Sequence, residues 1–201
     1  MKALRGWPAA GLLLALLIFP PVERASAIEI TKVGRLAEAR RDRLFEQLKN
    51  AKTETEGRAV ENAIWQMWMA EAPTPEIART VKAAMDARHQ AYDYNRALTL
   101  IDTVVAAAPA YAEGWNQRAF IRFLKEDLDG ALDDLDRALE LEPRHFGALS
   151  GKAIILMQQG RTELGQQALR EAVELHPWLK ERPMLVPAPV GPSLQPKGRD
   201  I

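Results

Sequence analysis

Small and apolar residues recur along the chain at intervals of 34 residues. Four prolines follow one another at this spacing: Pro75, Pro109, Pro143 and Pro177. Small or apolar residues stand twelve, eight and five positions before each proline, namely Ala63, Met67 and Ala70; Ala97, Ile101 and Val104; Ala131, Leu135 and Ala138; and Gly165, Leu169 and Ala172. Steps of four and three residues place each set on one face of a helix. Helices pack closely where contact residues are small, and proline stops a helix, so the pattern predicts a series of helix–turn–helix units.

The repeat resembles the tetratricopeptide repeat (TPR), a 34-residue pair of helices. The unit of residues 112–145 matches that motif with Trp115, Ala119, Ala131, Leu135, Ala138 and Pro143. It departs from the motif at Arg118 and Arg122, where the family has Leu and Tyr. Residues 78–111 and 146–179 give two further units. The resemblance implies an all-α fold, with helix–turn–helix repeats stacked as a right-handed α-solenoid.

The segments on either side of these units follow the pattern less well. In residues 28–77, Leu36, Leu44 and Leu48 lie at helical spacing, and Thr53 with Glu56 can cap a second helix. We interpret this segment as an N-terminal helical pair, a degenerate repeat that caps the array. Residues 180–201 are rich in proline and are expected to form a disordered tail. Either residues such as Trp178 and Met184 to Val186 fold back onto the last repeat, or another copy covers it.

The first 27 residues have the pattern of a secretory signal peptide. Lys2 and Arg5 precede an apolar run from Ala9 to Phe19, and a small-x-small site ends at Ala27. The run is shorter than the roughly 20 residues needed to span a bilayer. We therefore expect Sec-type export with cleavage after Ala27, a periplasmic or secreted protein, and no membrane insertion after cleavage. Retention of the segment as an anchor is the alternative.

Composition argues against nucleic-acid binding and against a cofactor, metal or catalytic site. Lys plus Arg and Asp plus Glu number 27 each, so charge does not favour nucleic acid as a partner. There is no cysteine, and the three histidines lack metal-ligand spacing, so no cofactor, metal or catalytic site is expected. We interpret the histidines as polar turn and surface residues. The acidic run from Glu126 to Asp136 is expected to be a solvated face, with Asp127 or Asp129 capping a helix.

Residues 142–149 and 112–116 also resemble a group of short secreted TPR proteins of alphaproteobacteria. Membership of that group implies a location and a fold without an activity. Within the first segment, Pro143 to Phe146 either shape the junction between two units, or Arg144 and His145 present hydrogen-bond donors to a partner.

The family resemblance places a partner-binding groove on the first helices of successive units. The corresponding residues here are Lys82, Asp86, His89, Asn116, Phe120, Phe123, Ser150, Ile154 and Met157. Asn116 could bond a peptide backbone, and the large apolar residues would form a floor for an apolar or mixed peptide. The leading hypothesis is a non-enzymatic scaffold or adaptor in the bacterial cell envelope that binds a peptide or helix of another protein. The alternative is a self-associating structural or assembly factor, a homo-oligomer formed through the uncapped end of the array.

Overall fold

The computed structural model describes residues 21–90 and 92–187, with the side chains of residues 21–33 left out. The helices, in chain order, are α2 (Pro21–Asn50), α3 (Glu54–Ala70), α4 (Pro75–Gln90), α5 (Tyr94–Ala107), α6 (Ala112–Leu124), α7 (Leu128–Leu141), α8 (Phe146–Gln158), α9 (Thr162–Leu175) and a short 3-10 helix, η1 (Arg182–Met184). The described residues form no strand. Residues 1–20 of the expected signal peptide lie outside the described part, so its cleavage stays a prediction.

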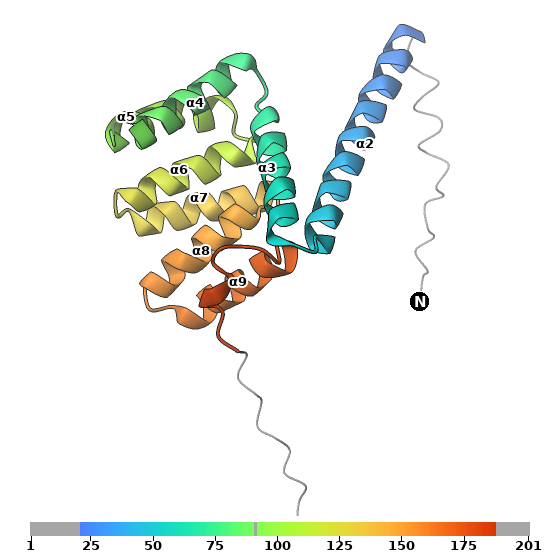
Figure 1. The fold of residues 1–201 in the computed structure, drawn as a ribbon. Helices are drawn as coiled ribbons and strands as arrows, with labels where there is room; N and C mark the ends of the chain where they lie inside the picture. The colour runs from blue at the N-terminus through green and yellow to red at the C-terminus, as the bar shows by residue number, and fades with distance from the viewer. Residues whose placement is uncertain (1–20, 91, 188–201) are drawn as a thin grey trace, which may run out of the picture. The chain divides into compact units, whose positions relative to one another are not determined.

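Three helical hairpins form a stack, α4 with α5, α6 with α7, and α8 with α9 (Figure 1). Each hairpin also packs on the next, through α5 with α6 and α7 with α8. The all-α fold of TPR-type repeats stacked as a right-handed solenoid is therefore confirmed. The chain divides into two compact units, residues 1–44 and residues 45–201, and all the contacts discussed below lie within the second.

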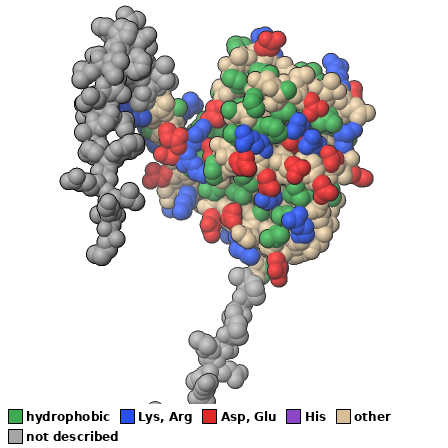
Figure 2. All heavy atoms as spheres, turned by 180° about the vertical axis from the view of Figure 1, so that it is seen from behind, with side chains coloured by type: hydrophobic (Ala, Val, Ile, Leu, Met, Phe, Trp, Pro, Cys, Tyr) green, Lys and Arg blue, Asp and Glu red, His purple; other side chains and the backbone are tan. Residues whose placement is uncertain are grey.

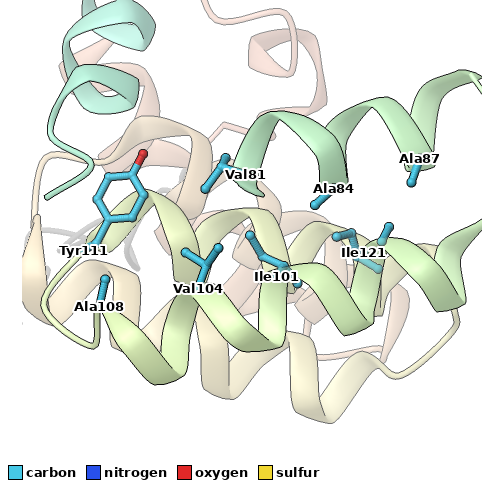
Figure 3. Packing of buried hydrophobic residues seen from close by; sticks show 9 residues of the cluster. Val81, Ala84, Ala87, Ile101, Val104, Ala108, Tyr111 and Ile121 are labelled. Carbon is cyan, nitrogen blue, oxygen red and sulfur yellow. The ribbon is translucent and has the colours of Figure 1, made fainter. Parts of the chain in front are cut away.

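The first hairpin shows why the 34-residue pattern produces close packing. Val81, Ala84 and Ala87 of α4 face Ile101 and Val104 of α5 (Figure 3). All five side chains are buried. The small residues let the two backbones approach, while the branched residues fill the remaining space. Ile121 of α6 joins the same cluster and continues the core into the next hairpin.

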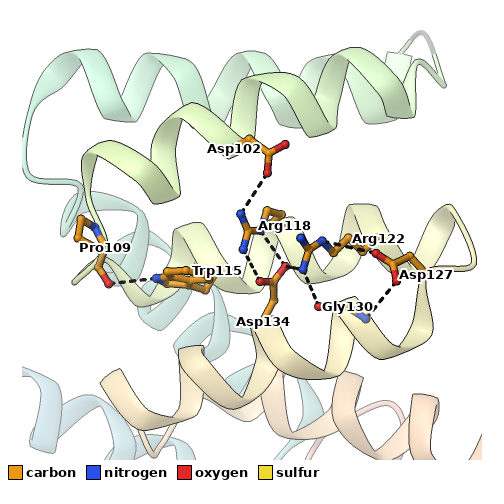
Figure 4. A network of polar contacts seen from close by, with 8 residues as sticks. All are labelled: Asp102, Pro109, Trp115, Arg118, Arg122, Asp127, Gly130 and Asp134. Carbon is orange, nitrogen blue, oxygen red and sulfur yellow. Dashed lines mark hydrogen bonds and ion pairs between the residues drawn. The ribbon is translucent and has the colours of Figure 1, made fainter.

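The two arginines that depart from the motif are paired with a buried carboxylate. Arg118 donates to Asp134 through both Nε and Nη2, at 2.9 and 2.6 Å, and Arg122 Nη1 lies 3.0 Å from the same carboxylate (Figure 4). Burial opposes charge on Arg118, but the bonds to Asp134 and Asp102 outweigh it and raise the pKa of its guanidinium. The prediction of a solvated acidic face is wrong for Asp134, because the two arginines draw it into the hairpin. The capping prediction is confirmed for Asp127, which accepts from Gly130 N at 3.1 Å.

The periodic prolines do not all act alike. α5, α7 and α9 end two residues before Pro109, Pro143 and Pro177, as expected of a helix stop. α3 instead ends at Ala70, and Pro75 is the first residue of α4. Proline suits that position, because the first N–H groups of a helix have no partner within it.

Helix α3 runs across the stack, at the ends of the other helices (Figure 1). Its Trp65 and Trp68 pack against His145 and Phe146 at the start of α8, and its C-terminal Met69 accepts a long hydrogen bond from Tyr111 Oη at 3.5 Å. Both tryptophans therefore contact the junction between α7 and α8. The expected cap of α3 is present, since Thr53 Oγ1 accepts from Glu56 N at 3.2 Å.

The segment after α9 folds back onto the last repeat as far as residue 187. The Gln166 amide donates to Met184 O at 2.9 Å and accepts from Val186 N at 2.8 Å. Trp178 lies against Gly57 of α3 and donates to Ala51 O at 3.2 Å. The tail expected from residue 180 therefore begins with an ordered stretch, and residues 188–201 lie outside the described part.

The surface carries mixed charge. Figure 2 shows acidic, basic and apolar side chains interspersed over the rear face. In the part of the chain that the structure describes, no helix is both long enough and apolar enough to cross a membrane.

Candidate functional site

A cavity of about 500 Å³ lies where α4, α6 and α8 face α3. We call it the groove. Its size falls within the range of roughly 300–1,000 Å³ usual for binding pockets. Its apolar lining includes Met69, Met85, Phe120, Phe123 and Ile154, and Leu179 to Glu181 also line it. Methionines and aromatic rings adapt to varied apolar partners, so the lining suits protein binding.

The structure brings together five of the nine residues predicted to bind a partner. The groove is lined by Asn116, Phe120, Phe123, Ser150 and Ile154. Phe120 is 43% exposed, so its ring is available to a partner. Asn116 and Ser150 are mostly buried and lie deeper.

The other four predicted residues do not line the groove. Lys82 and Asp86 form an exposed ion pair on α4 at 2.6 Å. His89 is also exposed and contacts the Arg88 guanidinium at 2.8 Å. Met157 lies past the groove on α8, where its sulfur contacts Gln166 Nε2 at 3.3 Å.

Buried polar residues that the sequence did not reveal form the inner wall. Glu113, 1% exposed, accepts from Gln117 at 2.5 Å and from Asn116 at 3.2 Å. Gln117 in turn accepts from Arg88 Nη1 at 2.7 Å. Burial lowers the pKa of Arg88 while the Glu113 charge acts against this, and the guanidinium stacks 4.5 Å from the Phe120 centroid. The network fixes both the polar wall and the exposed ring.

His145 completes this network and is fully buried, so its expected surface position is wrong. Its Nδ1 accepts from Ala148 N at 3.1 Å and caps α8, which assigns the ring proton to Nε2. Nε2 lies 2.9 Å from Glu113 Oε2. The ring also stacks on Trp68 at 4.0 Å. Both nitrogens are engaged, so His145 shapes the junction between two units and does not offer a donor to a partner.

His176 is the second buried histidine that was expected at the surface. Its Nε2 lies 3.2 Å from Glu61 Oε2 on α3. Arg58 also pairs with Glu61, at 2.8 Å. Burial favours the neutral acid, but these two contacts outweigh it and lower the pKa of Glu61 to about 2.

Two glycines allow α3 to lie close to the start of α8 and to Trp178. A Cβ on Gly147 would meet Trp65 at 2.5 Å, and one on Gly57 would meet Trp178 at 2.6 Å. Trp65 therefore closes the groove at the start of α8. The sequence contained one indication of these contacts: aromatic residues at the repeat junctions and tryptophans in α3 are expected to be packed. It did not indicate which of them contact one another, because that depends on where α3 crosses the stack.

Among the described residues no group of three or more His, Asp or Glu side chains could hold a metal ion. What the geometry offers is an apolar recess with a fixed hydrogen-bonding wall. This arrangement suits a ligand that is at least partly apolar.

The comparisons agree with the repeat fold. A family model described as tetratricopeptide repeat matches residues 112–145. A TPR repeat-containing protein of Rhizobium etli is 30% identical over 158 residues, covering 77% of this chain and 75% of that protein. This chain therefore belongs to the tetratricopeptide repeat proteins, which generally mediate protein–protein interactions.

Solved structures with a similar fold include the Sgt2 TPR domain from Aspergillus fumigatus, at 21% identity and a TM-score of 0.49, over 52% of this chain and 68% of that one. MamA (AMB-1) is 19% identical with a TM-score of 0.46, over 67% of this chain and 70% of that chain. These similarities concern the fold alone.

Proposed function

We propose that the chain is an adaptor of the bacterial cell envelope that binds a peptide or helix of another protein in the groove. The observation that supports this is the apolar side of the groove, where Phe120 is exposed and Phe123 and Ile154 are half-buried, beside a wall of bonded polar groups. Apolar side chains of a partner gain burial there, at roughly 25 cal/mol per Å² of apolar surface. Asn116 and Ser150 lie deeper and already donate within the chain, to Glu113 Oε2 and to Gly147 O.

The envelope location rests on the signal-like first 27 residues. Cell fractionation followed by N-terminal sequencing tests it. We expect the exported protein to begin at Ile28. An intact Met1 on a protein retained in the cytoplasm would contradict the proposal.

The groove is tested with a pair of matched charge substitutions. Phe120→Asp places a carboxylate in the groove, and Leu164→Asp places one on α9 outside it, at a side chain of similar exposure, 49%. Each tagged variant is cross-linked in envelope extract and its partners are captured, after circular dichroism has confirmed folding. We expect Phe120→Asp to lose the partners that wild type and Leu164→Asp retain. Equal capture by both folded variants would refute binding in the groove.

Self-association through a bare end of the array is supported less well. Residues 179–186 cover part of α9, through Gln166 and the buried Leu179. Light scattering across a range of concentrations tests this alternative, because a self-associating chain increases in mass with concentration.

A further inference from the structure

Arg88 is a buried cation in the wall of the groove that has no carboxylate partner among the described residues. It stands in the last turn of α4, lines the groove and is only 5% exposed. Its Nη1 donates to Gln117 at 2.7 Å and its Nη2 contacts the His89 ring at 2.8 Å, while its buried Nε has no partner. Buried charges in proteins are normally paired, because an unpaired one is costly to take out of water. The missing counter-ion therefore points to a ligand.

Glu113 does not supply this counter-ion directly. Gln117 links the two residues, since it accepts from Arg88 and donates to Glu113 Oε1 at 2.5 Å. Glu113 also accepts from Asn116 and lies 2.9 Å from His145 Nε2, so its oxygens are occupied. Burial outweighs the attraction of Glu113 and lowers the pKa of Arg88. The guanidinium thus keeps its capacity for a carboxylate from outside the chain.

The edge of the guanidinium that carries Nε and Nη2 has the form that binds a carboxylate. Arg118 uses the same two nitrogens to donate to Asp134, at 2.9 and 2.6 Å. In Arg88, Gln117 occupies Nη1, so the Nε–Nη2 edge is the one left for a second partner. Because Nε is covered in the free protein, a ligand must move a side chain to reach it. His89 is exposed, so its ring can swing into solvent and leave Nη2 to the ligand.

Apolar side chains lie next to this edge. The Phe120 ring is centred 4.5 Å from the guanidinium carbon and is 43% exposed. Met85, three residues before Arg88 on α4, lines the groove, as does Phe123, three residues after Phe120 on α6. An acidic residue held at Arg88 would therefore have apolar surface beside it for the residues that flank it.

The surrounding charges favour a single carboxylate over a more highly charged group. Among the described lining residues, Arg88 is the cation without an ion pair, because Lys180 lies 3.5 Å from Glu181. Glu61 and Glu113 also line the groove and add negative charge. A phosphate group carries a charge of about −1.5 to −2 and would meet one guanidinium edge among these acids. One carboxylate matches the two donors of that edge.

We propose that the groove recognises a segment of a partner protein in which one Asp or Glu is flanked by apolar residues. The carboxylate binds the Nε–Nη2 edge of Arg88 in place of His89, and the flanking side chains pack on Phe120 and Phe123. The inference rests on the proposed function, because it names the chemistry of the partner that the same groove binds.

The test is a selection of peptides on the full chain. Random peptides are displayed on phage through their C-terminal ends, so that only side chains supply carboxylates. Enriched peptides are then synthesised with amidated ends, each paired with a copy in which Asn or Gln replaces the acidic residue. Their affinity is measured by calorimetry for wild type, for Arg88→Met, and for the control Arg137→Met, which removes a 43% exposed arginine of α7 outside the groove.

We expect the enriched peptides to share one acidic position with apolar neighbours. The amide copy should bind wild type and Arg137→Met more weakly by roughly ten- to hundredfold, the value of a hydrogen bond to a charged group. Arg88→Met should bind both copies with nearly equal affinity. Arg88→Lys serves as a second variant if Arg88→Met does not fold, and it should reduce the preference for the acidic copy because lysine lacks the two-donor edge.

Two results would overturn the inference alone. One is a set of peptides whose binding is lost in Phe120→Asp but which share no acidic position. The other is an amide copy that is weakened equally on wild type and on the Arg88 variants. Peptides that bind Phe120→Asp as well as wild type would instead refute the proposed function, and a selection that yields no binder would overturn both.

Discussion

The buried carboxylate of Asp134 gives the sharpest test of how the second hairpin, α6 with α7, is held together. Its side chain is 2% exposed and lies between Arg118 and Arg122, which are 14% and 24% exposed. Asp134→Ala leaves two neighbouring guanidinium groups without their shared counter-ion. Breaking a buried pair in this way costs about 3–5 kcal/mol. For a chain of this size, that corresponds to a fall in Tm of roughly 6–20 °C.

The matched variants separate charge pairing from simple loss of volume. Arg118→Leu, Arg122→Tyr and Asp134→Ala together restore the apolar residues of the repeat motif and remove all three charges, so we expect stability near that of the wild type. Asp102→Ala removes only the exposed partner of Arg118, 49% exposed, and should cost at most about 1 kcal/mol. Unfolding in urea, followed by circular dichroism, measures all four proteins. A triple variant as unstable as Asp134→Ala would refute the reasoning.

Three further predictions concern the contacts of α3 and α8. Gly147→Ala should lower the free energy of unfolding by roughly 1–3 kcal/mol, because the new methyl group would clash with Trp65. Gly151→Ala on the same helix would meet Leu135 at an ordinary 3.6 Å and should raise the free energy of unfolding by about 0.5–1 kcal/mol. Thermal melts in which both variants shift Tm in the same direction would contradict this. Glu61 has its pKa lowered from 4.5 to about 2, so it stabilises the fold above about pH 4.5, and that contribution is lost as the pH falls through about 2. The difference in urea midpoint between wild type and Glu61→Gln should therefore be constant from pH 8 to pH 5 and shrink below, and a constant difference down to pH 2 would count against the assignment. His145→Asn should be more stable than His145→Ala by about 1 kcal/mol, because asparagine can still cap Ala148 N; equal urea midpoints would show that the cap contributes nothing.

The sequence predicted the repeat fold because its signal is local and periodic. Small or apolar residues recur in every unit at the positions of Ala97, Ile101 and Val104, and a helical face can be inferred from this spacing alone. Five of the nine residues named from the sequence line the groove, because the first helices of two successive units, α6 and α8, both face it.

The remainder of the site depends on contacts between distant segments. The family's groove positions in the unit of residues 78–111 are Lys82, Asp86 and His89, and these three do not line the groove. The burial of His145 and His176 follows from α3 crossing the junctions, and neither residue has a local pattern that reports this. Arg88 likewise looks like a surface residue until Gln117, 29 positions away, is placed beside it.

The crossing of α3 changes how the array should unfold. In most solenoids each repeat touches only its neighbours, so stability is a sum of local terms and the ends can open independently. Here one helix touches the starts of α6 and α8 and the segment after α9, and Trp178 bonds a carbonyl 127 residues earlier. Opening the last repeat therefore breaks contacts near the first. We expect the second unit to unfold in one cooperative transition, and to fold more slowly than a stack with only local contacts.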